Sequence, residues 1–590
     1  MSNALGGVAT KVVDTMNAQH DVYDVIVIGA GWSGLMATKY CLGEGLRTVA
    51  LESRDTIGGV WAYTAARQYG GVMKTTRTTS SRCVTEMSDF PMPADYPLFP
   101  SHDQIRAYLE AYCARFSLSE HIRLNQRVTR VAKRGDLWEV NTGDGSRWLA
   151  RGVIVSSGLH QYPNDVSGDD RFRGYSGRLT HSAAVKEVPP EWSGKTVVVW
   201  GGGESGSDIA CGASQVASRT YFCIPRGEWF VPKVVDRWPT TSYRRRSPRW
   251  SCVSSIRDRH PRVLDHTSSR LRLWFSPTHH YSPFINEYLE WAFGFNGHGQ
   301  EAWRTAAPYN RSFFNKSAEV LSRVESGHVI PKRDIASCRG RTVRFTDGTS
   351  ADVDAIVTCS GYRAEFPFLD ESVRAGTDPR NWFKYIFYND DPSLAFVGFA
   401  RPIFGSIPGL AELQSRYVAK VFSGGCRLPE PAARRATTRR DARFWNNHFR
   451  NTSLRIAGLV DHFVYSDQLA KLMGCYPNFW ALFFSSPRKW WQAITAPWSG
   501  CQFWLNDVRH HPRIFESFRR HSDDRFIQAH IWLLLAPLLP LIALWRHLQV
   551  FFRERLSRNS KTQLSGAANT RPSLRRAGWR RELEVERSFQ

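Results

Sequence analysis

The sequence predicts an α/β fold in which one strand–turn–helix–strand plan occurs twice. A chain of 590 residues is too long for a single hydrophobic core, because such cores stop growing at about 250–300 residues. Four short apolar runs rich in β-branched residues are typical of buried parallel strands, and glycines and a helix-like stretch follow the first run of each pair. The expected strands are Tyr23–Ile28 and Arg47–Leu51 in the first unit, and Lys195–Trp200 and Arg219–Ile224 in the second.

The first unit carries the pattern G-x-G-x-x-G directly after the strand Tyr23–Ile28. Gly29 permits a tight turn, Gly31 lets the backbone approach a pyrophosphate, and Gly34 allows the helix to pack on the strand. Glu52 ends the second strand, 18 residues beyond Gly34, where a carboxylate can accept hydrogen bonds from a ribose. Together these residues predict a Rossmann-like dinucleotide-binding domain rather than a plain glycine turn.

The second unit repeats the pattern with Gly201, Gly203 and Gly206 after the strand Lys195–Trp200. No carboxylate directly follows its second strand, but Arg226 does. A ribose hydroxyl favours a carboxylate, whereas a 2′-phosphate favours a guanidinium. The sequence therefore predicts a second Rossmann-like domain that binds NADPH in preference to NADH. The alternative is that Arg226 is one more surface arginine in an arginine-rich protein.

Charge and cysteine content limit the possible functions. The net charge is +24, and much of the excess lies in the stretch 244–262 and in the tail beyond Trp545. No zinc-ligand spacing or RNA-binding aromatic strand accompanies it, so we expect no nucleic-acid partner. Solvated charge and a membrane-surface role remain as alternatives. The eleven cysteines include no C-x-x-C pair, which argues against a disulfide framework and a thiol redox pair and favours a reducing compartment.

A hydrophobic stretch near the C-terminus, Ile531–Trp545, suggests contact with a membrane. It is 15 residues long, whereas a spanning helix needs about 20 apolar residues, and Pro537 and Pro540 interrupt it. An interfacial or re-entrant anchor is the favoured interpretation, and a buried core helix is the alternative. We take 529–552 as the membrane-associated segment.

Two nucleotide sites in one chain imply hydride transfer from a nicotinamide to a tightly held flavin. The reduced flavin could then reduce a disulfide, but the necessary C-x-x-C is missing. Transfer to a protein partner and reaction with oxygen remain, and composition does not separate them.

Further motifs resemble the flavin-containing monooxygenases, which are class B flavoprotein monooxygenases. Gly58–Trp61 is similar to that family's FAD signature, and Tyr175–Val185 is similar to its identifier F-x-G-x-x-x-H-x-x-x-F/Y, with Gly177 and His181 in register. The likeness covers about residues 23–520 and looks closest to the animal members. Its other segments are the second glycine motif, Met87–Tyr112, Thr358–Ser372, Gly405–Gly424 and Phe463–Pro487.

This resemblance implies two cofactors, FAD and NADPH, and a reaction with O₂. In the family, a flavin hydroperoxide forms and passes its distal oxygen to a soft nucleophile, while NADP⁺ shields it from water. The expected activity is N- or S-oxygenation of small lipophilic compounds, of the N,N-dimethylaniline type. Three alternatives stay open: Baeyer–Villiger oxygenation of a carbonyl, an NADPH oxidase that releases hydrogen peroxide, and an inactive membrane-tethered binding protein.

The sequence pattern and the resemblance together assign domains, location and site residues. An FAD-binding domain is expected at 23–165 and 350–525, and an NADPH-binding domain at 166–349 with a basic insertion near 237–325. A flexible leader, 1–22, precedes them, and a basic disordered tail, 553–590, follows the hydrophobic segment. The expected location is the endoplasmic reticulum membrane, and no metal is expected. The expected cofactor-binding residues are Gly29, Gly31, Ser33, Gly34, Glu52, Val60, Trp61, Thr78, Thr79, Ser80, Gly201, Gly203, Ser205, Gly206, Ser207, Asp208 and Arg226.

The sequence departs from the family at a position next to the flavin. The family's asparagine, which contacts both cofactors, corresponds to Thr79, the one catalytic residue we assign. One hypothesis is that its hydroxyl partly replaces the amide; the other is that Thr79 only packs, so that peroxide leaks. In the identifier, Tyr175 replaces Phe, and Val185 replaces an aromatic residue. We expect His181 to be structural rather than a catalytic base.

Overall fold

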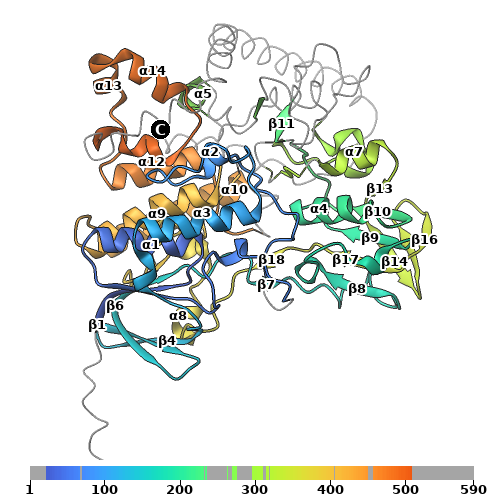
Figure 1. Cartoon of the computed structure of the whole chain (residues 1–590), viewed down its shortest axis with the longest axis horizontal. Helices are drawn as coiled ribbons and strands as arrows, with labels where there is room; N and C mark the ends of the chain where they lie inside the picture. The colour runs from blue at the N-terminus through green and yellow to red at the C-terminus, as the bar shows by residue number, and fades with distance from the viewer. Residues whose placement is uncertain are drawn as a thin grey trace, which may run out of the picture.

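The computed structural model shows a mixed β-sheet and a parallel β-sheet, each with its own helices, that lie side by side (Figure 1). Most of the predicted leader and basic insertion, the hydrophobic segment and the basic tail lie outside the residues that the structure describes. The described residues are 22–66, 70–231, 233–235, 262–263, 269–275, 295–309, 312, 314–317, 319–403, 405–449 and 456–507.

The first sheet has the strand order β3-β2-β1-β6-β5-β4, and β19 also pairs with β6. β4, β5 and β6 form an antiparallel meander, and the other pairings are parallel. Side chains along β1 alternate between two cores, Val25 and Val27 on one face and Ile26 and Ile28 on the other. The bounds are β1 (Val22–Ile28), β2 (Thr48–Leu51), β3 (Ile122–Arg123), β4 (Val128–Arg134), β5 (Leu137–Thr142), β6 (Arg147–Val155) and β19 (Leu394–Phe396).

Three helices cover one face of this sheet (Figure 1): α1 (Trp32–Gly43), α3 (His102–Arg115) and α9 (Ile407–Phe422). α3 begins with a capping box, in which the hydroxyl of Ser101 accepts from the N–H of Gln104 and the Gln104 side chain accepts from the N–H of Ser101 at 2.9 Å. α9 begins beside Ser406, whose Oγ accepts from the N–H of Gly409 at 3.1 Å. These caps fix the ends of the helices that lie next to the cofactor region.

The second sheet has the order β13-β10-β9-β17-β8, and all of its pairings are parallel. α4 (Glu204–Ala213) and α7 (Glu319–Glu325) pack on one face, and the small antiparallel sheet β14-β15-β16 packs on the other. The bounds are β8 (Arg178–His181), β9 (Thr196–Trp200), β10 (Arg219–Cys223), β13 (Val329–Lys332), β14 (Ile335–Arg339), β15 (Thr342–Phe345), β16 (Ser350–Asp352) and β17 (Ala355–Thr358). The duplicated α/β plan predicted from the sequence is confirmed.

Two linkers join the sheets, and they pair with each other. β7 (Tyr162–Pro163) follows β6 and runs antiparallel to β18 (Tyr362–Arg363), which follows β17. The chain therefore leaves the first sheet after Val155 and returns after Thr358. The return predicted at residue 350 needs correction, because β17 lies between β8 and β9 in the second sheet.

The remaining elements are short strands and helices outside the two large sheets. Within the described residues, no helix combines the length and the apolarity that crossing a bilayer requires. The bounds are α2 (Arg82–Thr85), β11 (Val234–Val235), β12 (Arg262–Val263), α5 (Arg270–Phe275), α8 (Glu371–Arg374), β20 (Arg401–Pro402), α10 (Pro431–His448), β21 (Leu459–Val460), α12 (His462–Leu472), α13 (Phe479–Ser485), α14 (Pro487–Thr495) and the 3₁₀ helix η11 (Gly500–Asp507).

Candidate cofactor sites

The first glycine turn, residues 29–34, joins β1 to α1. Gly29 has a φ of +103°, in the left-handed region that favours glycine, and its N–H donates to the carbonyl of Leu51 at 2.8 Å. A Cβ on Gly34 would lie 1.9 Å from the carbonyl oxygen of Gly29. A Cβ on Gly31 would meet backbone atoms of Gly59 alone, the nearest at 3.4 Å. Gly34 is therefore required by the packing of the fold, whereas the backbone of Gly31 is open to a ligand.

Glu52 fixes this turn from the end of β2. The side chain is buried, and its Oε2 accepts from the N–H of Ala30 at 2.7 Å while its Oε1 accepts from the N–H of Arg54 at 2.9 Å. A carboxylate has about four acceptor positions, so ribose hydroxyls can still bond to it. The geometry is compatible with the predicted ribose contact, which remains a prediction.

The turn Gly58–Trp61 packs directly on the first glycine turn. The N–H of Gly58 donates to the carbonyl of Ala30 at 3.0 Å, and a Cβ on Gly59 would lie 3.0 Å from the Cα of Gly31. The guanidinium of Arg54 donates to the carbonyls of Gly59 and Ala62, each at 3.0 Å. Val60 and Trp61, which are half-buried, are thereby held beside the predicted pyrophosphate position.

The sequence analysis missed Gly398, which follows β19. Its φ is +92°, its N–H donates to the side chain of Gln414 at 2.9 Å, and a Cβ there would lie 2.3 Å from the Oγ of Ser33. Ser33, a predicted cofactor-binding residue, thus lies between the glycine turn and the loop that leads to α9. The signal in the sequence is one glycine directly after a buried run, and this signal alone is weak.

Three buried polar atoms, in the first glycine turn and in the segments that contain Thr78 and Ser156, have no hydrogen-bond partner among the described residues. They are the Nε1 of Trp32, the Oγ1 of Thr78 and the Oγ of Ser156. The Cβ of Ser156 lies 3.6 Å from where a Cβ on Gly34 would be. A buried polar group without a partner costs about 1–3 kcal/mol, so a ligand that bonded these atoms would be stabilised. The residues present therefore fit a bound dinucleotide.

The segment 73–80 connects the two domains. Met73 is buried in the core of the second domain, and the N–H of Lys74 donates to the carbonyl of Lys186 at 2.9 Å. Further along, the N–H of Thr78 donates to the carbonyl of Pro100 at 2.9 Å in the first domain. The Oγ of Ser80 is 2.8 Å from the Oγ1 of Thr85. Thr79, half-buried between Thr78 and Ser80, therefore lies in a stretch whose ends are fixed by different domains.

The second glycine turn, residues 201–206, repeats the geometry of the first. Gly201 has a φ of +118°, and a Cβ on Gly206 would lie 2.0 Å from its carbonyl oxygen. A Cβ on Gly203 would have no atom within 4 Å. The fully buried Ser207 accepts from the Nδ2 of Asn315 at 2.8 Å, and this amide also donates to the carbonyl of Gly202 at 2.9 Å. Asn315 lies more than a hundred residues away in sequence, and the sequence analysis did not identify it.

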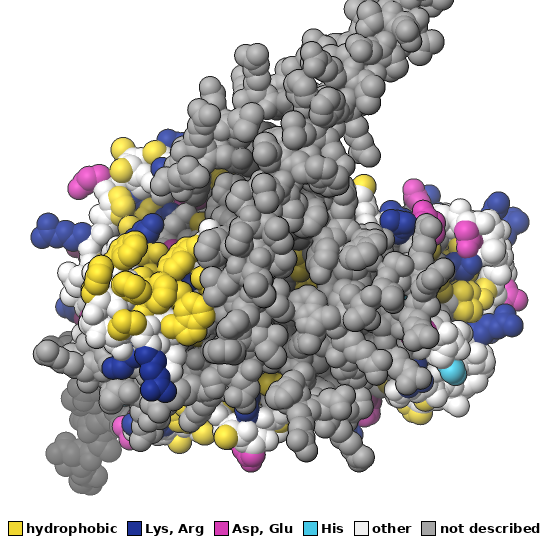
Figure 2. Space-filling view, turned by 90° about the horizontal axis from the view of Figure 1, so that it is seen from above, with side chains coloured by type: hydrophobic (Ala, Val, Ile, Leu, Met, Phe, Trp, Pro, Cys, Tyr) yellow, Lys and Arg dark blue, Asp and Glu magenta, His cyan; other side chains and the backbone are white. Residues whose placement is uncertain are grey.

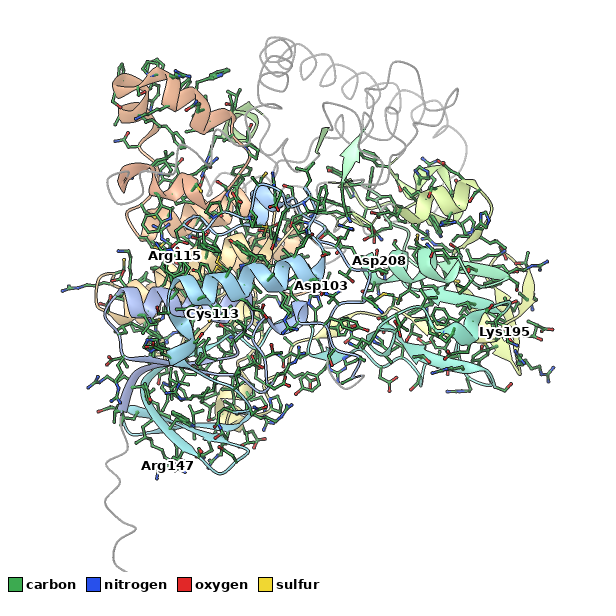
Figure 3. All side chains as sticks on the ribbon, in the orientation of Figure 1. Asp103, Cys113, Arg115, Arg147, Lys195 and Asp208 are labelled. Atoms are coloured by element: carbon green, nitrogen blue, oxygen red, sulfur yellow. The ribbon has the colours of Figure 1, made fainter. Side chains whose placement is uncertain are left out.

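Asp208 lies in the middle of α4, and Figure 3 shows it on the side of the second domain toward Asp103, which is near the start of α3. Burial raises its pKa to about 6, and the charge of Glu319 adds to this effect while that of Lys233 opposes it. The carboxyl group of Asp208 is therefore half-protonated at about pH 6. Ser205, on the same helix, is exposed.

Arg226 is exposed in the turn after β10. The second glycine turn lies close to the end of that strand, since a Cβ on Gly202 would stand 2.4 Å from the Cγ2 of Ile224. The turn that carries Arg226 therefore begins next to the second glycine turn. The contact of Arg226 with a 2′-phosphate remains a prediction.

The identifier segment forms β8 and the turn after it, next to the linkers. The hydroxyl of Tyr175 donates to the carbonyl of Val353 at 3.1 Å, and Val185 is buried in the second-domain core. The Nδ1 of His181 accepts from the N–H of Ala183 at 3.0 Å, and its ring meets the ring of Tyr362 edge-on at 5.3 Å. These contacts support the structural role predicted for His181.

Comparison with protein families identifies the chain. The model of the family described as flavin-binding monooxygenase-like matches residues 23–248 and 297–512. The chain belongs to this family. The matched ranges include both glycine turns, the segment 73–80 and the identifier, so the predicted resemblance to the flavin-containing monooxygenases is confirmed.

Similar proteins of this family carry out different oxidations. A dimethylaniline monooxygenase (N-oxide-forming) 2 of Mus musculus is 30% identical over 507 residues, which cover 82% of this chain and 88% of that protein. A 4-hydroxybenzoate brominase (decarboxylating) of Marinomonas mediterranea is 31% identical over 466 residues, which cover 77% and 84%. Flavin-containing monooxygenase 2 of Homo sapiens is 29% identical, with coverage of 82% and 88%.

Solved structures share the fold. An S-allyl-L-cysteine S-oxygenase from Allium sativum aligns with a TM-score of 0.54 at 22% identity, covering 87% of this chain and 98% of that one. A cyclohexanone monooxygenase from Rhodococcus sp. Phi1 bound to NADP⁺ aligns with a TM-score of 0.53 at 18% identity, covering 77% and 98%. At these identities the likeness shows the fold alone.

Membership of the flavin-binding monooxygenase-like family makes this chain an oxidoreductase, a flavin-dependent monooxygenase. The ten described cysteines are free thiols, so the described residues hold no disulfide for the flavin to reduce. The family does not decide which atom of which substrate receives oxygen, because its relatives at about 30% identity bear the names of an amine oxygenase and a brominase.

Proposed function

We propose that this protein uses FAD, NADPH and O₂ to oxygenate nitrogen or sulfur atoms of small lipophilic compounds. The main support is the pair of equivalent glycine turns: in each, the third glycine packs on the first, and the middle glycine leaves its backbone open. Two such turns in a flavin-dependent monooxygenase fit two dinucleotides. We assign FAD to the turn 29–34 and NADPH to the turn 201–206.

In this proposal the bound flavin supplies the redox chemistry, taking a hydride from the nicotinamide and activating oxygen. The chain's residues bind and orient. The N-termini of α1 and α4 present free N–H groups and a positive dipole end to the two pyrophosphates. Glu52 accepts from a ribose, and Arg226 donates to the 2′-phosphate. Thr79 offers a hydroxyl donor from the segment 73–80, and that segment helps to exclude water between the domains.

Choice of substrate is the least supported part of the proposal. The amine-oxygenating relative supports nitrogen as an acceptor, whereas the brominase at similar identity is a reminder that the same fold serves other oxidations. Baeyer–Villiger chemistry is the alternative, although Val185 and Lys186 lack the Trp and Pro or Asp of that class's identifier. An NADPH oxidase is the other, because Thr79 replaces the family's asparagine.

A test on the purified protein decides among these. We expect a yellow protein that retains FAD and that consumes NADPH faster than NADH. Turnover with a tertiary amine, a thioether and a cyclic ketone, followed by mass spectrometry, should give an N-oxide or sulfoxide. A lactone from the ketone would favour the Baeyer–Villiger alternative, and hydrogen peroxide equal to the NADPH consumed would favour the oxidase. A colourless protein that fails to retain added FAD would refute the proposal as a whole.

We also propose attachment to the endoplasmic reticulum membrane through the segment 529–552, on the strength of its apolar sequence alone. Ending the chain after Ile527 should lower the share of the protein in the membrane fraction, with its flavin retained. A truncated protein that stays with the membranes in folded form would contradict this segment as the sole attachment.

A further inference from the structure

α13 and α14 form a helical hairpin that is packed on one side. The ring of Phe483 meets the ring of Trp490 edge-on at 5.0 Å, which holds the two helices together. Phe479 on α13 and Ile494 on α14 are buried in a small core with Leu271 and Leu505. One side of the hairpin is therefore packed on the rest of the protein, and this packing turns its other side toward solvent.

The other side of the hairpin presents aromatic side chains to solvent. Trp480 is 75% exposed and Phe484 is 78% exposed, and no other large apolar side chain among the described residues exceeds 46%. The two are four residues apart on a helix, so they lie on the same face. Figure 2 shows an apolar patch on the side of the molecule where α13 and α14 lie. Patches of this kind mark binding surfaces in soluble proteins.

The charges of the hairpin itself have one sign. Arg488 and Lys489 are exposed in the first turn of α14. Between Asp467 and Asp507 the sequence contains no acidic residue. Exposed aromatic side chains flanked by Lys and Arg are typical of helices that lie in the interface of a bilayer with anionic lipids.

We propose that the α13–α14 hairpin docks on an anionic lipid bilayer, with Trp480 and Phe484 inserted among the lipids and Arg488 and Lys489 at the head groups. The amphipathic character of the aromatic face favours the boundary between head groups and acyl chains. The absence of carboxylates from the hairpin, residues 479–495, favours anionic lipid over an acidic-and-basic protein surface, where complementary charges of both signs are the rule.

The position of Asp507, the last described residue, also favours lipid on the side of the molecule where the hairpin lies. η11 ends at Asp507 beside the hairpin, where the Oδ1 of Asn506 accepts from the N–H of Asn478 at 2.9 Å. The apolar run that begins at Ile531 follows Asp507 by 24 residues in the sequence. The hairpin surface is independent of that run, since it is built from residues that the structure describes.

Photocrosslinking in the full-length, flavin-loaded protein tests the proposal. Phe484→p-benzoylphenylalanine places a reactive group on the patch, and Val216→p-benzoylphenylalanine is the matched control, because Val216 is an exposed apolar residue (39%) of the second domain. Both proteins are illuminated with vesicles of phosphatidylcholine and phosphatidylserine, and adducts are identified by mass spectrometry. We expect a phospholipid adduct at position 484 and none at position 216.

Other adducts at position 484 would overturn the proposal. A crosslink to residues 508–590 would mean that the chain itself covers the patch, and a crosslinked dimer would mean that a second copy does. The lack of any lipid adduct, whether or not the protein binds the vesicles through another segment, would overturn it as well.

The contribution of charge has its own pair of variants. Arg488→Glu with Lys489→Glu should lower the lipid adduct at position 484 about tenfold or more on phosphatidylserine vesicles, with a small effect on phosphatidylcholine alone. Lys195→Glu with Arg219→Glu changes the net charge equally in the second domain, and Figure 3 places Lys195 far from the hairpin. An equal loss in both double variants would show a response to net charge only and would refute the assigned contact.

Discussion

Alanine substitutions in the second glycine turn separate what the fold requires from what the ligand requires. A Cβ at position 206 would lie 2.0 Å from the carbonyl oxygen of Gly201, a backbone atom that no rotamer change can move. A Cβ at position 203 would have no atom within 4 Å, and Gly203 has φ −76° and ψ 177°, which alanine also adopts. Gly206→Ala is therefore expected to damage packing, and Gly203→Ala is expected to damage nucleotide binding.

The magnitudes follow from these distances. Real Cβ contacts are essentially never under 3.0 Å, so α4 and the turn must separate by at least 1.0 Å, which is 3.0 minus 2.0 Å, in Gly206→Ala. Overpacking of this kind costs about 1–3 kcal/mol, and the gain in helix propensity offsets about 1 kcal/mol of it. The net loss is therefore up to about 2 kcal/mol, which corresponds to a fall in melting temperature of up to about 4–8 °C. Gly203→Ala should stay within about 2 °C, because a weaker N-cap and a less flexible unfolded chain roughly cancel.

Binding of NADP⁺ should be weakened more by Gly203→Ala than by Gly206→Ala. In Gly203→Ala the new methyl group occupies the space through which the pyrophosphate approaches the backbone, and the loss of one charge-assisted hydrogen bond weakens affinity by roughly 10- to 150-fold. Thermal unfolding without nucleotide and titration with NADP⁺, both on flavin-loaded protein, measure the two effects. A Gly203→Ala protein that binds NADP⁺ like the wild type would refute the assignment of this turn to the nucleotide. A Gly206→Ala protein that melts like the wild type would refute the packing argument.

Three further predictions concern Asp208, Arg226 and Thr79. Because the folded-state pKa of Asp208 is raised to about 6, its ionised form destabilises the fold above that pH, so Asp208→Asn should stabilise at pH 8 by up to about 3 kcal/mol. That gain should disappear as the pH falls from 6 to below 4 in thermal unfolding, and a pH-independent gain would contradict it. Arg226→Ala should raise the KM for NADPH about 10- to 100-fold and leave that for NADH unchanged; an equal change for both would refute the 2′-phosphate contact. Thr79→Val should raise the share of NADPH that ends as hydrogen peroxide without loss of bound flavin, whereas an unchanged share would mean that Thr79 only packs.

The parts of the fold that the sequence predicts are those determined by neighbouring residues. β1, β2, β9 and β10 are contiguous apolar runs, and their boundaries agree with the predicted strands within one residue. The glycine turns are equally local, since the clash between the third and first glycines involves residues five apart. A spacing motif therefore carries enough information to predict both turns and the helices that follow them.

Contacts between distant segments could not be predicted in this way. Asn315 bonds Gly202 and Ser207 across more than a hundred residues, and Gly398 meets Ser33 across more than three hundred. The return of the chain after Thr358 places β19, and with it Gly398, beside the first glycine turn, whereas Asn315 meets Gly202 and Ser207 inside the second domain. The predicted border at residue 350 was wrong for the same reason, because nothing in the apolar run of β17 shows which of the two sheets it joins.

Thr79 is a residue whose role cannot be predicted from a sequence motif alone. Its position was assigned from the spacing of a sequence motif. In the structure, however, Met73 of the segment 73–80 is buried in the second domain, and Thr78 is hydrogen-bonded to the first domain. A rotation of one domain on the other would therefore displace the hydroxyl of Thr79 more than it would displace Glu52, whose hydrogen bonds to Ala30, Ser53 and Arg54 lie within one domain. The reach of that hydroxyl toward a bound flavin depends on domain packing rather than on the residue's identity. This dependence is why the Thr79→Val measurement, and not the missing asparagine, decides whether the protein retains its oxidising equivalents or releases them as peroxide.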